Sequence, residues 1–377
     1  MTLKIIFDAN PLVIGKSGVG YYTQGLIQAL ADNYRQDIKL IGYYFNFAGH
    51  KQPAGLPVAP NIQYIGVKLI SEKVINLCRR LGFRFPLNLL LRQHADIVLS
   101  TNFVPSLYIP KTKRVIAVHD LSFVDTPEYV SVRNLSFLQR WAPRAINSSD
   151  LILTISNFTK QRIMNAYAVP DEKLHVTPIP PATHTPADYA IIKKYHLDDD
   201  YLLFVGTIEP RKNIVNLLNA YSLMKPDLQK NFPLVLAGGK GWNDEAILAR
   251  ITELQKKGLN IIQTGYISDA EKAALYEKAT ICIQPSHYEG FGMPVLEAMS
   301  YGKPVACSDI AVLCEVGGKA AVYFDKDNPQ SITNTLTSLL TNPDSLARLS
   351  DRSIAHISSY PTWKKVATGL YDRLVTL

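Results

Sequence analysis

The sequence predicts an α/β protein made of two domains, each with a mostly parallel sheet covered by helices on both faces. Short apolar segments that read as buried strands alternate with helix-like segments along both halves of the chain. The proline-rich stretch PIPPATHTPA, residues 178–187, has no hydrophobic periodicity and separates the halves as a stiff linker would. The 377 residues suffice for two domains. The expected domains are residues 1–180, joined by a final helix over 360–377, and residues 188–358.

The first half is expected to begin with a buried strand, a glycine-containing turn and a helix from about Tyr21 to Asp32. This arrangement is typical of the phosphate-facing corner of a Rossmann-type domain. Gly18 and Gly20 begin like a dinucleotide fingerprint, but Thr23 stands where the third glycine would be, so a plain tight turn is the alternative. The strands expected in this half are residues 4–9, 38–45, 62–67, 96–100, 114–119 and 151–156.

Two strand ends in the first half carry polar side chains. VIAVHDLSF ends a strand at His119, on the edge where open α/β sheets bind ligands, although an isolated histidine is more often structural. TISNFTK predicts a helix capped by Asn157, and Ser156 and Asn157 either cap that helix or face a ligand.

The second half repeats the alternation and places two cations at a strand-to-helix loop. Arg211 and Lys212 follow the strand YLLFVGT, where a guanidinium and an ammonium can neutralise a diphosphate. As an isolated charge pair they would be an ordinary solvated surface. The expected strands are residues 201–207, 233–239, 261–268, 281–285, 305–309 and 321–325.

The most informative stretch is ICIQPSHYEGFGMPVLEAMSYGKP, residues 281–304, which predicts a strand, a loop and a helix. Glu289 lies in the loop and Glu297 in the helix, whose N-terminus near Met293 is a natural seat for phosphate. A carboxylate can accept two sugar hydroxyls, whereas the alternative is a surface loop with two solvated glutamates. The part of the loop where backbone can approach a ligand without a Cβ clash comprises Gly290, Phe291 and Gly292.

These motifs resemble those of the retaining glycosyltransferases of family 4. SHYEGFGMPVLEAMSYGKPV is similar to their E-x(7)-E signature and VGTIEPRKN to a second signature. The resemblance implies the GT-B fold, in which an acceptor-binding and a nucleotide-sugar-binding Rossmann-like domain face a central cleft and the C-terminal helix crosses back to the N-terminal domain. It also implies that Glu289 contacts the donor sugar, Glu297 the ribose hydroxyls, and Arg211 and Lys212 the diphosphate.

The same resemblance implies a role for each of the remaining candidate residues. It places His119 near the donor sugar and phosphates, and Gly18 and Gly20 in a loop facing the phosphates and the acceptor. Gly238 lies where the backbone approaches the nucleotide, and Tyr266 borders the base. It implies a retaining hexosyltransferase whose co-substrate is a nucleotide-diphosphate sugar, with no other cofactor.

A weaker resemblance narrows the choice of nucleotide-sugar donor. HDLSF followed by Pro127 and Glu128 is similar to bacterial mannosyltransferases that use GDP-mannose in surface polysaccharide synthesis, such as O-antigen or exopolysaccharide. A UDP-sugar-dependent enzyme or a nucleotide-sugar 2-epimerase is the alternative, and the missing third glycine disfavours an NAD oxidoreductase. The strings at 198–200 and 325–327 imitate a metal-binding D-x-D. We expect them to be solvated loops and the reaction to need no metal.

The net charge of +8 points to an anionic partner for the first half of the chain. Residues 1–187 carry +9 and the remainder −1. No nucleic-acid-binding motif is visible, so an anionic membrane face fits better. Residues 71–92 are either a basic amphipathic helix lying on that membrane or a core helix with solvated arginines. With no apolar run of about 18 residues and no secretion signal, we expect a cytoplasmic protein, peripheral on the inner face of the membrane.

Overall fold

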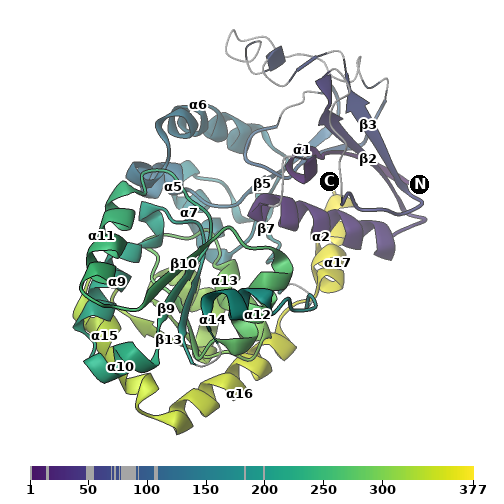
Figure 1. The fold of residues 1–377 in the computed structure, drawn as a ribbon. Helices are drawn as coiled ribbons and strands as arrows, with labels where there is room; N and C mark the ends of the chain where they lie inside the picture. Colours follow the sequence, from purple (N-terminus) through teal and green to yellow (C-terminus); the bar gives the residue numbers. More distant parts are fainter. Residues whose placement is uncertain are drawn as a thin grey trace. The chain divides into compact units, whose positions relative to one another are not determined.

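The computed structural model describes residues 2–13, 17–47, 55–68, 70–71, 74–75, 77, 91, 93–105, 109–181, 184–197 and 200–377. The chain divides into two compact units, one of Met1–Pro180 with Pro361–Leu377 and the other of Pro181–Tyr360. Each unit contains one parallel sheet with helices packed against it (Figure 1). The predicted fold class, two Rossmann-like sheets in an α/β chain, is therefore confirmed.

Within its described residues, the first unit has a seven-stranded sheet in the order β3-β2-β1-β4-β5-β6-β7. Its central strands are buried along most of their length because helices cover both faces, which is why they read as continuous apolar runs. The short last strand was not predicted. The strands are β1 (Leu3–Asp8), β2 (Ile38–Phe45), β3 (Ile62–Val67), β4 (Ile97–Ser100), β5 (Lys113–Val118), β6 (Leu151–Thr154) and β7 (Leu174–Val176). The helices are α1 (Asn10–Val13), α2 (Gly18–Asn33), α5 (Ser122–Asp125), α6 (Val132–Ser148) and α7 (Asn157–Tyr167).

Helix α2 begins earlier than predicted, and this corrects the expectation of a glycine-rich loop. Ser17 is its N-cap, with its hydroxyl accepting a hydrogen bond from the Gly20 N–H at 3.1 Å. Gly18 and Gly20 therefore form the first helical turn. A serine cap satisfies an otherwise unpaired N–H and so favours helix initiation at this point. A similar correction applies to α7, which is capped by the hydroxyl of Ser156 and has Asn157 as its first residue.

The C-terminal helix α17 (Trp363–Leu374) packs on α2 within the first unit (Figure 1). Thr362 caps it as predicted. A Cβ added at Gly25 would come within 2.2 Å of the Trp363 ring, so only glycine permits this close approach. Tyr34 and Tyr371 stack at 3.8 Å between ring centroids and extend the contact.

The second unit has a six-stranded sheet in the order β10-β9-β8-β11-β12-β13. Helices α9, α11 and α15 cover one face and enclose an apolar core (Figure 1). The strands are β8 (Leu202–Val205), β9 (Leu234–Ala237), β10 (Ile261–Gly265), β11 (Ile281–Gln284), β12 (Val305–Ser308) and β13 (Ala321–Phe324). The helices are α8 (Ala190–Tyr195), α9 (Ile214–Leu223), α10 (Pro226–Asn231), α11 (Glu245–Lys256), α12 (Asp269–Lys278), α13 (Met293–Ser300), α14 (Ala311–Gly317), α15 (Pro329–Leu340) and α16 (Pro343–Ser359).

Each sheet reverses its strand order once, at β1/β4 in the first unit and at β8/β11 in the second. Open parallel sheets bind ligands beyond the carboxyl ends of the strands at such a point, because the loops there diverge. Arg211 and Lys212 follow β8 and Glu289 follows β11, so the second reversal lies beside these charged candidates.

Among the described residues, no helix is long and apolar enough to span a membrane. Most of the predicted basic segment 71–92 lies outside the described residues, as do Asp198 and Asp199. Asp325 and Asp327 lie in an exposed loop, where the Asp327 N–H donates to Asp325 and the Asp327 carboxylate pairs with Lys326.

Candidate active site

Arg211, Lys212 and Glu289 form one buried ion cluster beyond the β8/β11 reversal. The Lys212 ammonium lies 2.6 Å from Glu289 Oε1, and the Arg211 guanidinium lies 3.0 Å from Glu289 Oε2. Lys212 and Glu289 are only 8% and 6% exposed. The sequence motifs, 77 residues apart, are thus brought into direct contact by the pairing of β8 with β11.

The loop backbones hold this cluster in place. Lys212 ends a short 3-10 turn, Pro210–Lys212, after which Asn213 adopts a left-handed conformation with φ of 56°. The Asn213 side chain donates to the carbonyl oxygens of Pro285 and Lys326, and the His287 N–H donates to the Arg211 carbonyl. The loops after β8, β11 and β13 are therefore tied together, which fixes the relative positions of the charged side chains.

The electrostatics of the cluster keep Glu289 ionised. Burial alone would raise the pKa of this carboxyl, but the charges of Lys212 and Arg211, with hydrogen bonds from Lys212 and Ser286, outweigh it and lower the pKa to about 2. Burial lowers the pKa of the Lys212 ammonium, and the neighbouring Glu289 opposes that shift. Two cations thus face the Glu289 carboxylate, and Arg211 also pairs with Glu209. This arrangement suits an anionic ligand that replaces part of these contacts.

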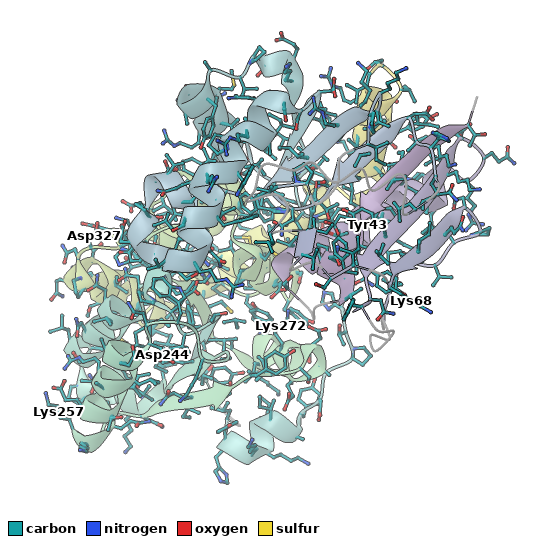
Figure 2. All side chains as sticks on the ribbon, turned by 90° about the horizontal axis from the view of Figure 1, so that it is seen from above. Tyr43, Lys68, Asp244, Lys257, Lys272 and Asp327 are labelled. Atoms are coloured by element: carbon teal, nitrogen blue, oxygen red, sulfur yellow. The ribbon has the colours of Figure 1, made fainter. Side chains whose placement is uncertain are left out.

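Glu297 lies apart from this cluster, within α13, and has its own partners. It is 8% exposed and accepts hydrogen bonds from Lys272 at 2.8 Å and from the Tyr276 hydroxyl at 3.1 Å. Lys272 is labelled in Figure 2. Both partners project from α12 one helical turn apart, which is why they reach the same carboxylate. Burial, followed by the charge of Glu297, raises the pKa of Tyr276, so its hydroxyl stays protonated and donates.

The glycine-rich loop before α13 has a defined steric role. Gly292 is the N-cap of α13 and has φ of 109°, a region that residues with a Cβ rarely occupy. A Cβ there would meet Leu313 at 2.5 Å. Phe291 is buried, while Met293 and Pro294 open the helix, as predicted. Gly290 precedes this turn.

Gly238 and Tyr266 lie at the ends of neighbouring strands in the same unit. A Cβ at Gly238 would meet the carbonyl oxygen of Gly206 at 1.9 Å, so the fold itself requires this glycine. Tyr266 is 79% exposed and lies beside Gly239 after β10, with its ring available for stacking.

His119 belongs to the first unit, at the end of β5, and is 6% exposed. Its Nε2 lies 2.8 Å from the Thr101 carbonyl, which can only accept, so Nε2 carries the proton and Nδ1 is the acceptor. Burial lowers the pKa of His119, which keeps the ring neutral. Tyr22 of α2 packs edge-on against the ring at 5.1 Å, so the structure brings the start of α2 close to His119.

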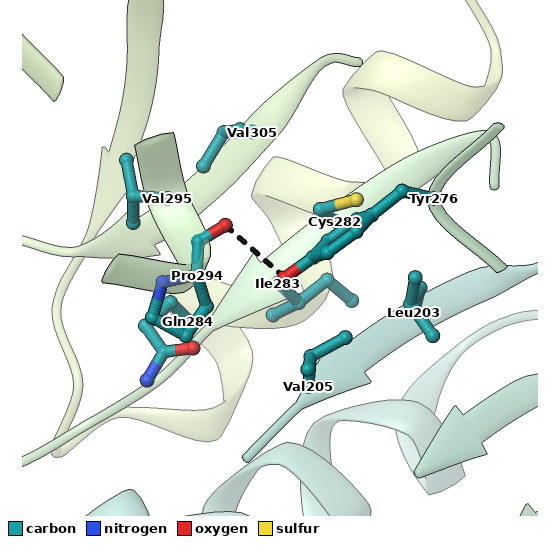
Figure 3. A pocket seen from close by; sticks show the side chains of 9 residues that line it. All are labelled: Leu203, Val205, Tyr276, Cys282, Ile283, Gln284, Pro294, Val295 and Val305. Atoms are coloured by element: carbon teal, nitrogen blue, oxygen red, sulfur yellow. Dashed lines mark hydrogen bonds between the residues drawn. The ribbon is translucent and has the colours of Figure 1, made fainter. Parts of the chain in front are cut away.

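A cavity of about 10 Å³ lies between β11 and α13 (Figure 3). It is far too small for a nucleotide, so it is a packing void behind the site. Its lining consists of Leu203, Val205, Tyr276, Cys282, Ile283, Gln284, Pro294, Val295 and Val305.

The comparisons with known proteins agree with this geometry. The family model described as glycosyltransferase family 4 matches residues 16–180, and the model for glycosyl transferases group 1 matches residues 190–356. The two-sheet fold and the motif residues thus define a glycosyltransferase enzyme of GT-B type. The chain belongs to the family 4, or group 1, glycosyltransferases.

Individual relatives cover the whole chain. The chain is 29% identical to the O-antigen chain mannosyltransferase B of Escherichia coli over 97% of its length and 98% of that protein. Solved structures share its fold as well. Sucrose-phosphate synthase from Thermosynechococcus elongatus superimposes with a TM-score of 0.75 at 17% identity, covering 99% of both chains. HepE from Anabaena, in complex with UDP and glucose, superimposes with a TM-score of 0.73 at 15% identity, covering 100% of both chains.

Proposed function

We propose that the protein transfers a mannosyl residue from GDP-mannose to a hydroxyl of a glycan or lipid-linked glycan in the synthesis of a cell-surface polysaccharide. The observation that carries the proposal is the buried cluster of Arg211, Lys212 and Glu289 at the β8/β11 reversal. The similarity to an O-antigen chain mannosyltransferase over nearly the full length of both proteins supports the sugar and the pathway.

In this proposal different residues of the cluster contact the diphosphate and the sugar of the donor. Arg211 and Lys212 stabilise the negative charge that develops on the departing diphosphate, and Glu289 accepts hydroxyls of the sugar. Glu297 holds the ribose. The bond from the anomeric carbon to the diphosphate oxygen breaks as the acceptor oxygen bonds to the same face. The acceptor proton passes to the diphosphate, so the anomeric configuration is retained.

We also propose a role for residues of the first unit. His119, being neutral with Nδ1 unprotonated, can accept a hydrogen bond from a hydroxyl of the sugar or the acceptor. Helix α2, which begins with Gly18 and Gly20, packs the Tyr22 ring against His119. We propose that Gly18 and Gly20 face the phosphates and the acceptor. We further propose that no divalent cation is needed, because two side-chain cations already lie where the leaving charge develops.

Binding of the donor is tested by thermal unfolding with GDP, UDP, GDP-mannose and UDP-glucose, with and without EDTA. A ligand at 100 times its Kd stabilises the folded state by about 2.7 kcal/mol, so we expect GDP and GDP-mannose to raise Tm by about 5 °C. EDTA should change neither shift. A UDP-sugar donor is the second candidate, since HepE, which shares the fold, binds UDP and glucose. Shifts with UDP and UDP-glucose alone would replace GDP-mannose with that donor.

We also propose that the first unit contacts an anionic membrane surface on the cytoplasmic side. The first observation is the positive charge of residues 1–187. The second is in helix α6, where the guanidinium carbons of Arg140 and Arg144 lie 5.2 and 4.9 Å from the centre of the Trp141 ring. No carboxylate among the described residues pairs with these two arginines. Exposed arginines beside a half-buried aromatic ring suit lipid headgroups.

Sedimentation with phosphatidylglycerol vesicles tests the membrane contact. Wild-type protein should bind these vesicles and not phosphatidylcholine vesicles. Since each basic residue near the surface contributes about 1 kcal/mol, the double variant R140Q/R144Q should bind roughly 30-fold more weakly. The matched double variant K230Q/K256Q, with exposed lysines of the second unit, should bind like wild type. Equal binding to both vesicle types would contradict the proposal.

A further inference from the structure

The two oxygens of the Glu289 carboxylate have unequal environments. Oε1 accepts three hydrogen bonds, from Lys212 at 2.6 Å, from Ser286 at 2.7 Å and from Gln284 at 2.8 Å. Among the described residues, Oε2 accepts one, from Arg211 at 3.0 Å. A carboxylate oxygen has about two lone pairs for hydrogen bonds, so Oε1 is saturated by the chain itself and Oε2 retains acceptor capacity.

Gln284 is the less obvious member of this arrangement. It is the last residue of β11 and is 2% exposed, and its amide nitrogen donates both to Glu289 Oε1 and to the Ser286 hydroxyl. Its side chain also lines the small cavity behind the site (Figure 3). The side-chain oxygen of Gln284 is buried and has no hydrogen-bond partner within the described part of the chain.

The unpaired oxygen shows what determines the orientation of the Gln284 amide. Leaving a buried carbonyl unpaired is unfavourable. The pairing of the Gln284 oxygen therefore does not explain why the side chain lies where it does. Turning the amide over would direct its oxygen at the Glu289 carboxylate, where two acceptors would face each other. Glu289 therefore determines the orientation of the Gln284 amide, and the amide in return holds Oε1 of Glu289 in place.

We propose that Gln284 and Ser286 are positioning residues that hold Oε1 of Glu289 and direct Oε2 at the sugar of the bound donor. This inference rests on the proposed function. It adds which oxygen of Glu289 contacts the sugar and which residues orient that oxygen. The Arg211 guanidinium is shared with Glu209, at 2.7 and 3.1 Å, and with the Tyr288 carbonyl. When a diphosphate draws Arg211 away from Oε2, the anchored carboxylate stays in place and a sugar hydroxyl takes the position left.

The test compares a nucleoside diphosphate with its sugar nucleotide in the variant Q284M, which keeps the length of the side chain but removes the donor. Calorimetry with GDP and GDP-mannose should show a GDP affinity within twofold of wild type. The GDP-mannose affinity should fall by about 10-fold, as expected for loss of one hydrogen bond to a charged group. The variant S286A should show the same selective loss. A merely structural role would weaken both ligands together.

The matched control is S308A. The Ser308 hydroxyl is buried and donates to the main-chain carbonyl of Gln284 at 3.4 Å, but it does not touch Glu289. Both affinities should remain those of wild type. Equal losses of GDP and GDP-mannose affinity in Q284M and S286A, or no loss in either folded variant, would overturn the inference. If wild type binds UDP and UDP-glucose instead, the donor proposal fails by itself, and the same comparison with that pair tests the positioning role.

Discussion

Replacing Lys212 with methionine is expected to weaken binding of the nucleoside diphosphate by about 10- to 100-fold, the effect of losing a charged hydrogen bond. The same change should lower the free energy of unfolding by about 3 kcal/mol. Lys212 is buried and its ammonium lies 2.6 Å from Glu289, so methionine fills the space but leaves a buried carboxylate with only Arg211 as a cation. One residue thus serves both ligand binding and stability.

Both effects of K212M are measurable without knowing the acceptor. Calorimetry with GDP gives the affinity, and urea unfolding followed by circular dichroism gives the free energy. The matched control is K257M, since Lys257 is the exposed C-cap residue of α11 and pairs with Glu253 at 2.7 Å. That variant should resemble wild type in both measurements. Wild-type GDP affinity in folded K212M would show that Lys212 does not contact the diphosphate.

Most of the fold could be predicted because a parallel sheet covered on both faces requires apolar strands. Segments such as Leu151–Thr154 and Ile281–Gln284 are buried at every position and read as apolar runs up to their last residue. β7 was missed because only one of its three residues, Leu174, is fully buried, so its sequence shows no such run. The start of α2 was misplaced because glycine usually favours turns, whereas the Ser17 cap extends the helix through Gly18 and Gly20.

The charged centre of the site could be predicted from local motifs, but its supporting residues could not. Arg211 and Glu289 each follow a recognisable strand, and the pairing of β8 with β11 brings them together. Lys272 and Tyr276 reach Glu297 only because of how α12 packs, and a lysine and a tyrosine one turn apart on a helix are common. Gln284 did leave a signal, since it is a polar residue at the end of an otherwise apolar buried strand.

Replacing Glu289 with glutamine is expected to reduce transfer by at least about 100-fold, as seen when one preorganised polar contact to a transition state is removed. Unlike K212M, this variant should bind GDP at least as tightly as wild type. In wild type the diphosphate must compete with the Glu289 carboxylate for Arg211 and Lys212, and the neutral amide removes that competition. Calorimetry with GDP and a transfer assay with GDP-mannose separate the two effects.

The pH dependence of stability gives E289Q a second readout that is independent of any substrate. The folded-state pKa of Glu289 is lowered from 4.5 to about 2, which corresponds to about 3 kcal/mol. A carboxyl with a lowered folded-state pKa contributes its stability above its unfolded pKa and loses it as pH falls toward the folded value. The difference in unfolding free energy between wild type and E289Q should therefore shrink from pH 6 to pH 3. A difference that stays constant over this range would mean that Glu289 is not held ionised by Lys212 and Arg211, and the charge competition inferred for the diphosphate would then have no basis.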